Sequence, residues 1–155
     1  MRRVGVFLAF FVMTTAAYAQ LPNKVKRRAG VWEYKLQSGY EILEVKGDEL
    51  QGVGYRVNQK TSDTSRVENI RIRRVNKTMV CSMTTYNMVK DSVVATTHEL
   101  ISSGRKLKFQ NISAPTPYAI KYSMGFFNRN RLYIRVYHGP ETKPVKLILT
   151  RKKEA

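Results

Sequence analysis

Hydrophobic and polar residues alternate along most of the chain after residue 29, in short runs separated by turn-forming residues. These runs are rich in Val, Ile, Thr, Tyr and Phe, which is typical of β-strands. They span residues 31–36, 40–45, 49–57, 65–75, 78–86, 92–100, 106–111, 118–127, 131–138 and 144–151. No window after the N-terminus has a convincing amphipathic-helix pattern. The pattern predicts an all-β fold, an antiparallel up-and-down meander of about ten strands. Closure into a barrel would remove its exposed edges, and an open sandwich is the alternative.

Alternation also predicts which side chains face the core, because successive residues of a strand point to opposite faces. For the run at 78–86 the two faces are too alike to separate. Elsewhere the predicted inward residues are Trp32, Tyr34, Leu36, Glu68, Ile70, Ile72, Tyr118, Ile120, Tyr122, Met124, Phe126, Leu132, Ile134, Val136, His138, Val145, Leu147, Leu149 and Arg151.

The N-terminus has the three parts of a secretory signal peptide. A basic start is followed by an apolar run at 4–13 and by a small-x-small site, Ala17-Tyr18-Ala19. The run is shorter than the roughly 20 apolar residues of a membrane span. We therefore expect residues 1–19 to be removed and the protein to be exported, to the periplasm or beyond, without a transmembrane span. Residues 20–29 then form a basic lead-in, and 30–153 form a single domain.

The chain is strongly basic, with 28 Lys and Arg against 11 Asp and Glu and a net charge of +17. Eight of the basic residues fall on predicted outward positions, and the last six lie on consecutive strands with Tyr133 and Tyr137 among them. Such a surface suits lipopolysaccharide, anionic lipid or an acidic polymer, or it serves only solubility. Nucleic acid is not expected as a partner of an exported protein. The eight are Arg71, Arg73, Lys106, Lys108, Lys121, Arg131, Arg135 and Lys146.

The interior of a ten-strand barrel leaves a cavity unless large side chains fill it. Six polar residues are predicted to line it, and they are the candidates for binding a small apolar or amphipathic ligand. An inward carboxylate needs a partner, because burial of an unpaired charge costs several kcal/mol. The two acids therefore pair with Tyr, His or Arg groups of the protein, lie at a hydrated rim of the barrel, or bind the polar head of a ligand. The six are Tyr34, Glu41, Glu68, His98, Tyr122 and His138.

Signs of catalysis or of a cofactor are weak. The chain has no Gly-x-Ser-x-Gly elbow and no evident triad. His98 and His138 are its two imidazoles, without a third metal ligand at regular spacing. Cys81 is the one cysteine, so no internal disulfide forms, and we expect a buried rather than a reactive thiol. We expect no enzyme activity, no cofactor and no bound metal.

Gly30 and Trp32 open the first predicted strand, and Arg151 ends the last one. This combination resembles the signature of the calycins, which include the lipocalins and the fatty-acid-binding proteins. The resemblance implies that Trp32 plugs the closed end of a barrel with Arg151 across its ring, and that Gly30 lets the backbone pass close to that ring.

A resemblance over nearly the whole mature chain is to a family of secreted bacterial domains of unknown function, treated as lipocalin-like barrels. The family motifs G-x-W, Y-E-x-W, L-x-G-x-x-Y and F-E-N-P…H-D-F-P correspond to residues 30–32, 40–43, 50–55 and 109–117. Leu43 replaces the second Trp, Gln110 replaces the Glu, and residues 114–116 replace His-Asp-Phe. The resemblance implies fold and export, and no reaction.

Overall fold

The computed structural model describes residues 20–87, 90–111 and 116–152, so the predicted signal peptide lies outside the described residues. A short helix precedes ten strands. The elements are α1 (Asn23–Lys26), β1 (Gly30–Tyr34), β2 (Gly39–Lys46), β3 (Glu49–Val57), β4 (Thr64–Val75), β5 (Thr78–Asn87), β6 (Ser92–Ser102), β7 (Lys106–Gln110), β8 (Ala119–Met124), β9 (Arg131–Tyr137) and β10 (Val145–Arg151).

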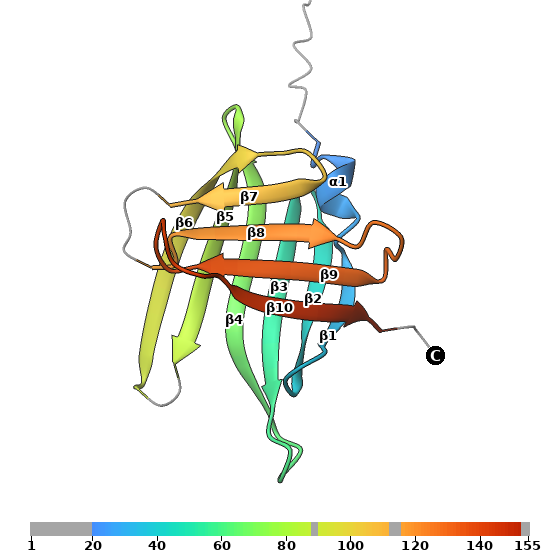
Figure 1. Cartoon of the computed structure of the whole chain (residues 1–155), viewed down its shortest axis with the longest axis vertical. Coiled ribbons are helices and arrows are strands. Elements are labelled where there is room, and N and C mark those ends of the chain that lie inside the picture. Colours follow the sequence, from blue (N-terminus) through green and yellow to red (C-terminus); the bar gives the residue numbers. More distant parts are fainter. Residues whose placement is uncertain (1–19, 88–89, 112–115, 153–155) are drawn as a thin grey trace, which may run out of the picture.

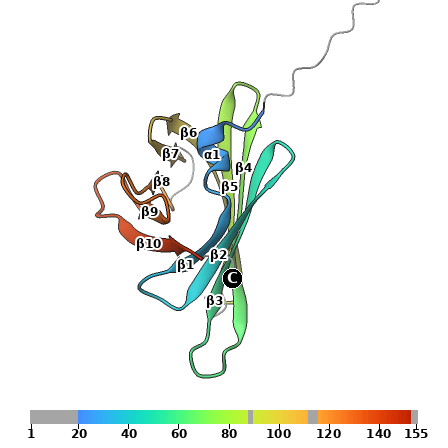
Figure 2. The ribbon, with the colours of Figure 1, turned by 90° about the vertical axis from the view of Figure 1, so that its right-hand side faces the viewer.

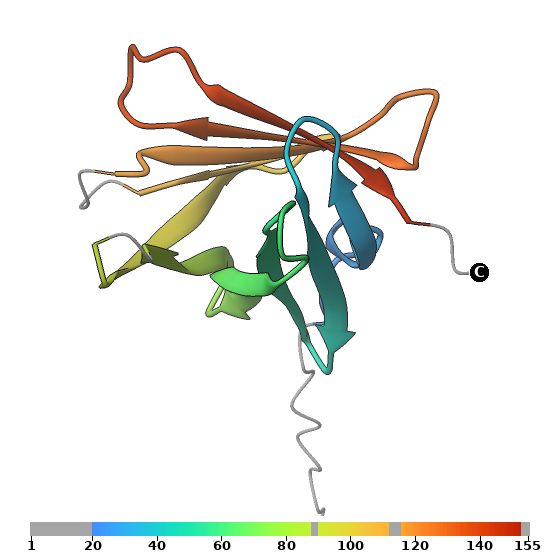
Figure 3. The same cartoon turned by 90° about the horizontal axis from the view of Figure 1, so that it is seen from below.

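The strands form a closed antiparallel barrel in which each strand pairs with the next one along the chain, and β1 pairs with β10. The predicted fold class is therefore confirmed, and the open sandwich is excluded. Figure 1 shows β7 to β10 crossing in front of the long strands β3, β4 and β5. Figure 2 shows the long strands as one wall, with β7 to β10 on the opposite side. From below, Figure 3 shows the two walls joined at one side through β1 and β2.

The alternation of the sequence sets the interior of the barrel. Ile70 and Ile72 on β4 are buried, as are Leu132 and Ile134 on β9 and Leu149 on β10. The strand whose faces could not be separated, β5, turns three sulfur-containing side chains into the core, and these are Met79, Cys81 and Met83.

Three apolar residues predicted to face inward are exposed instead, among them Val145, which is 49% exposed at the start of β10. Leu36 is 78% exposed in the turn after β1, and Phe126 is 66% exposed in the turn after β8. The predictions for Leu36 and Phe126 were wrong because β1 and β8 end earlier than the apolar runs do. After β8 the chain turns sharply at Gly125, where a Cβ would collide with the carbonyl oxygen of Asn128. Beyond Gly125 the chain is no longer a strand, so alternation along the sequence does not predict which way a side chain points.

The N-terminal segment covers one end of the barrel, beside β7 in Figure 1. Leu21 and Val25 are buried in the core cluster, and the Lys24 ammonium donates a hydrogen bond to the carbonyl oxygen of Ser103 in the β6–β7 turn. The sequence pattern missed α1 because four residues make only one turn, which is too short for a helical period. Within the described part of the chain, no helix has the length and apolar character of a membrane span.

Candidate functional site

The closed end of the barrel is built around Trp32, which is fully buried. Its indole Nε1 donates a hydrogen bond of 2.8 Å to the carbonyl oxygen of Arg28. The guanidinium carbon of Arg151 lies 4.4 Å from the ring centroid. The same guanidinium donates to the carbonyl oxygens of Ala29 at 2.6 Å and Arg27 at 3.0 Å. The last strand is thereby tied to the segment that enters the first.

Gly30 makes room for the guanidinium of Arg151 rather than for the ring of Trp32. A Cβ at residue 30 would collide with Nη1 of Arg151, and the backbone φ of +139° is one that other residues rarely adopt. The resemblance implied that Gly30 lets the backbone pass close to the ring of Trp32, but the close contact of Gly30 is with the guanidinium of Arg151.

The opposite end of the barrel opens into a cavity of about 790 Å³. Tyr34, Glu68 and His138 are the predicted ligand-binding residues that line it. The apolar part of its wall consists of Val57, Val67, Val136, Val145 and Leu147.

Two acids flank one glycine in the interior. In the strand register Gly54 on β3 is paired with Glu41 on β2 and with Glu68 on β4, and the pairing shifts at a bulge just beyond it. Gly54 has no side chain, and the Glu68 side chain lies over it: a Cβ at residue 54 would be 3.3 Å from the Cβ of Glu68 and 3.8 Å from its Oε2. Sequence alternation placed each acid inside, but only the register places them together.

Burial raises the pKa of both carboxyl groups, so each keeps its proton to a higher pH than an exposed acid does. It raises the pKa of Glu41 to about 8, with a further contribution from the nearby Glu68 carboxylate. It also raises the pKa of Glu68 to about 7. Glu41 is 1% exposed, and neither of its carboxyl oxygens has a hydrogen-bond partner among the described residues. The pKa of Tyr34 is raised by burial first, and then by Glu41 and Glu68.

Tyr122 and Cys81 lie deeper in the same interior. The Tyr122 hydroxyl hydrogen-bonds the Cys81 thiol, yet burial raises the pKa of that thiol well above its usual range, and Glu68 adds to the effect. The pKa of Tyr122 is raised by burial, and then by Cys81 and Glu41. Both groups are therefore neutral, and a neutral thiol is a poor nucleophile.

The two histidines do not act together. His98 is fully buried, and its Nε2 lies 2.7 Å from the carbonyl oxygen of Pro117, so this nitrogen carries the proton and donates. Burial lowers the pKa of His98 and keeps the ring neutral. His138 follows the last residue of β9 and is exposed at the cavity mouth, so its predicted core position was wrong. In the described segments, no three His, Cys, Asp or Glu side chains are grouped to hold a metal.

Arg28 is a buried residue that sequence reasoning missed, because it sits in a run that looks like a solvated lead-in. It is 2% exposed, and burial lowers the pKa of its guanidinium to about 10. Its Nη1 donates to the carbonyl oxygen of Lys24. Its position just before Gly30 and Trp32 was the one available signal, since its carbonyl accepts the hydrogen bond from Trp32.

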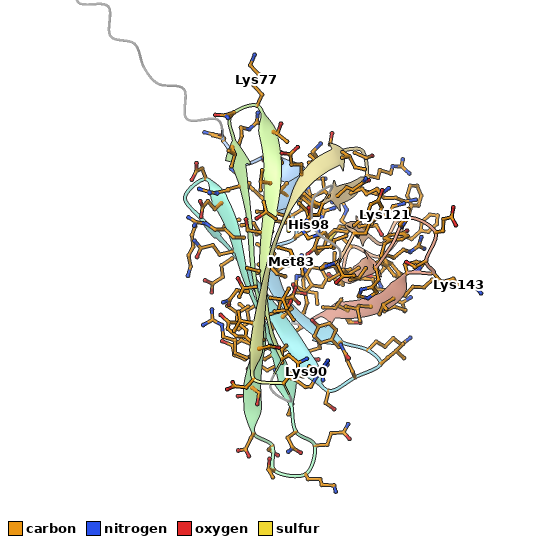
Figure 4. All side chains as sticks on the ribbon, turned by 90° about the vertical axis from the view of Figure 1, so that its left-hand side faces the viewer. Lys77, Met83, Lys90, His98, Lys121 and Lys143 are labelled. Atoms are coloured by element: carbon orange, nitrogen blue, oxygen red, sulfur yellow. The ribbon has the colours of Figure 1, made fainter. Side chains whose placement is uncertain are left out.

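The predicted cationic surface divides into two parts. Lys108, Lys121, Arg135 and Lys146 are directly paired across β7, β8, β9 and β10, and we call these four the cationic row. Lys106 and Arg131 lie on the same four strands, outside the row. Figure 4 shows Lys121 on the β7–β10 side and His98 between the walls.

Arg71 and Arg73 lie on β4, away from the row. Arg71 forms a two-pronged ion pair with Glu49, with Nε–Oε2 at 2.6 Å and Nη2–Oε1 at 2.8 Å. Neither residue therefore belongs to the cationic row. No ion pair within residues 20–87, 90–111 and 116–152 involves the row, Lys106 or Arg131.

Comparison of the chain with family models, with curated proteins and with solved structures found no match.

Proposed function

We propose that this chain is an exported, non-catalytic protein that binds one small apolar or amphipathic molecule inside its barrel. The observation that carries the proposal is the open cavity of about 790 Å³, whose wall has an apolar part and one acid, Glu68. This volume lies within the range of roughly 300–1,000 Å³ typical of small-molecule sites. The neutral, buried Cys81 thiol supports a binding role over a catalytic one.

The two ends of the interior differ in how completely side chains fill them. Trp32, Leu107 and Phe109 are fully buried and fill the closed half. Toward the mouth the lining includes the smaller side chains Ser65 and Thr85. Since a barrel of this strand number needs large inward side chains to fill it, small ones leave room for a ligand.

Filling the cavity should weaken ligand binding. We expect the neutral dye N-phenyl-1-naphthylamine to bind the mature protein at one saturable site with a rise in fluorescence. A Thr85→Trp substitution places an indole in the cavity and should weaken binding at least about tenfold, equivalent to about 1.4 kcal/mol. Thr97→Trp is the matched control, because Thr97 is exposed on the neighbouring strand β6 and does not line the cavity.

Equal dye binding by the wild type and both tryptophan variants would place the dye outside the lumen and contradict the proposal. Native mass spectrometry of protein purified from its expression host gives an independent readout, since a bound molecule adds a discrete mass that Thr85→Trp should remove.

The cationic row favours a second candidate function, an interaction module for an anionic envelope component. Like charges directly opposite each other in a sheet are destabilising, and no acid of the described residues neutralises this row. A bound polyanion would relieve that repulsion. Lipopolysaccharide, anionic lipid and acidic polymers share the required chemistry.

Neutralising the row tests this candidate. We expect the protein to bind phosphatidylglycerol vesicles, with an affinity that falls as salt rises through screening. Changing Lys108, Lys121, Arg135 and Lys146 to Gln should weaken that binding at least about tenfold. The charge-matched control changes four exposed lysines outside the row to Gln, and these are Lys35, Lys60, Lys77 and Lys90. An equal loss in both variants would show that net charge alone attracts the vesicle.

A further inference from the structure

Glu41 is a buried acid without a partner. It is 1% exposed, and both carboxyl oxygens lack a hydrogen bond among the described residues. A buried polar group is normally hydrogen-bonded, because leaving it unpaired carries the full desolvation penalty. Glu41 lies on the inward face of β2, where it acts electrostatically on Tyr34 of β1 and Tyr122 of β8. Its carboxyl group therefore points into the lumen.

A second acid converges on the same place from the cavity side. Glu68 lines the cavity, and it flanks Gly54 from the strand opposite to that of Glu41. Backbones two strands apart are separated by roughly 10 Å, and the glycine between them contributes no side chain. The Glu68 side chain therefore lies over Gly54 on the side of Glu41, with no side chain of β3 between the two acids. Tyr34 lies close to both acids, because it lines the cavity and the charges of Glu41 and Glu68 both raise the pKa of its hydroxyl.

No cation of the described residues neutralises this pair. The three ion pairs of the described chain involve Glu33, Glu44 and Glu49. The other titratable groups that face the acids are Tyr34, Cys81 and Tyr122, all neutral.

Two arginines approach the site without pairing with the acids. Arg56 lines the cavity, and its positive charge lowers the pKa of Tyr34 and so offsets part of the rise caused by burial. Arg28 acts on Tyr122, but its Nη1 hydrogen bond goes to the carbonyl oxygen of Lys24. The chain has a net charge of +17, yet neither lumen acid forms an ion pair within the part of the chain that the structure describes.

We propose that the ligand of the cavity carries a protonated amine, which binds between Glu41 and Glu68 while its apolar tail lies along Val67, Val136 and Leu147 toward the mouth. This inference rests on the proposed function and names the chemical class of its ligand. An ammonium donates up to three hydrogen bonds, enough to satisfy both carboxyl groups. Charge-assisted hydrogen bonds in a dry site are the stronger kind, so the head group supplies selectivity while the tail supplies burial.

Three ligands that differ only in their head group test the inference. Dodecylamine, dodecanol and dodecanoate are titrated against bound N-phenyl-1-naphthylamine at about pH 8. We expect dodecylamine to displace the dye at a concentration at least about tenfold lower than dodecanol, and dodecanoate to be the weakest. Adsorption to the basic outer surface would give the reverse order, because that surface repels an amine and attracts a carboxylate.

Isosteric variants assign the preference to the two acids. Glu41→Gln and Glu68→Gln should each bring dodecylamine close to the level of dodecanol and leave dodecanol unchanged. Glu44→Gln is the matched control, because Glu44 is an exposed acid on the same strand as Glu41. A second readout needs no variant: the affinity of the wild type for dodecylamine should rise from about pH 6 to about pH 9, as the acids ionise while the alkyl amine stays protonated.

The outcomes separate this inference from the proposed function. Equal affinities for the amine and the alcohol, or tightest binding of dodecanoate, would overturn the inference and leave the lumen as an apolar site. Failure of all three ligands to displace the dye would overturn the inference and the proposed function together.

Discussion

The ligand-free protein should lose stability as the pH rises from about 5 to about 8, and Glu41→Gln should remove most of that loss. The pKa of Glu41 is raised from a usual value of 4.5 to about 8 in the folded state. Between those values the folded chain holds a proton that the unfolded chain has released. Its contribution to stability is therefore complete below about pH 4.5 and is lost as the pH rises through 8. A shift of this size corresponds to about 3–5 kcal/mol.

Other groups modify the pH window without reversing its direction. The pKa of Glu68 is raised to about 7, so it adds to the loss. The pKa of His98 is lowered, so stability from this group is gained as the pH rises toward 6.5, which opposes part of the effect. The unopposed loss therefore lies between about pH 6.5 and pH 8.

Urea unfolding at a series of pH values measures this effect. The Glu44→Gln control changes an exposed acid and should follow the wild type within about 0.5 kcal/mol. A wild-type stability that stays flat or rises between pH 6.5 and pH 8 would mean that the interior acids are already ionised and paired, and would contradict the geometry of the acidic pair.

Removing either half of the Trp32–Arg151 stack should destabilise the whole barrel. Trp32→Ala empties the largest buried side chain of the core and should lower the free energy of unfolding by about 3–5 kcal/mol. Arg151→Ala removes the contact with the ring and two hydrogen bonds to the entering segment, which together are worth about 2–3 kcal/mol.

Two further variants identify the cause. Arg151→Lys should recover little stability, because an ammonium reproduces neither the flat stack nor the fork of donors. Lys152→Ala removes the next residue, whose exposed ion pair with Glu33 spans 3.5 Å, and should change stability by less than about 0.5 kcal/mol. A melting temperature unchanged by Arg151→Ala would rule out the stack as the closure of the barrel.

The barrel was predictable because its physical cause is local. Alternation with period two places one face of each strand inside, and short turns force neighbouring strands to pair. The meeting of the first and last strands is the long-range step, and the Gly30-x-Trp32 motif with a terminal Arg151 indicated it. Predictions failed where strands stopped before their apolar runs did, at Leu36 and at Phe126.

The candidate site was predictable only in part. Sequence alternation placed Glu41 and Glu68 inside, but their meeting across Gly54 depends on the register of three strands. The burial of Arg28 depends on how the N-terminal segment packs over the barrel end, which no periodicity records. Likewise, the partner of Arg71 is Glu49, 22 residues earlier in the chain, and only the pairing of β3 with β4 reveals it.

Titration of isotope-labelled protein with N-phenyl-1-naphthylamine, followed by two-dimensional nuclear magnetic resonance, locates the bound molecule. If the ligand enters the barrel, the backbone amide signals of Tyr34, Gly54 and Glu68 should shift together and saturate, while those of Lys108 and Arg135 on the outer wall stay in place. Shifts confined to the outer faces of β7 to β10, with the lumen signals unmoved, would contradict binding inside the barrel.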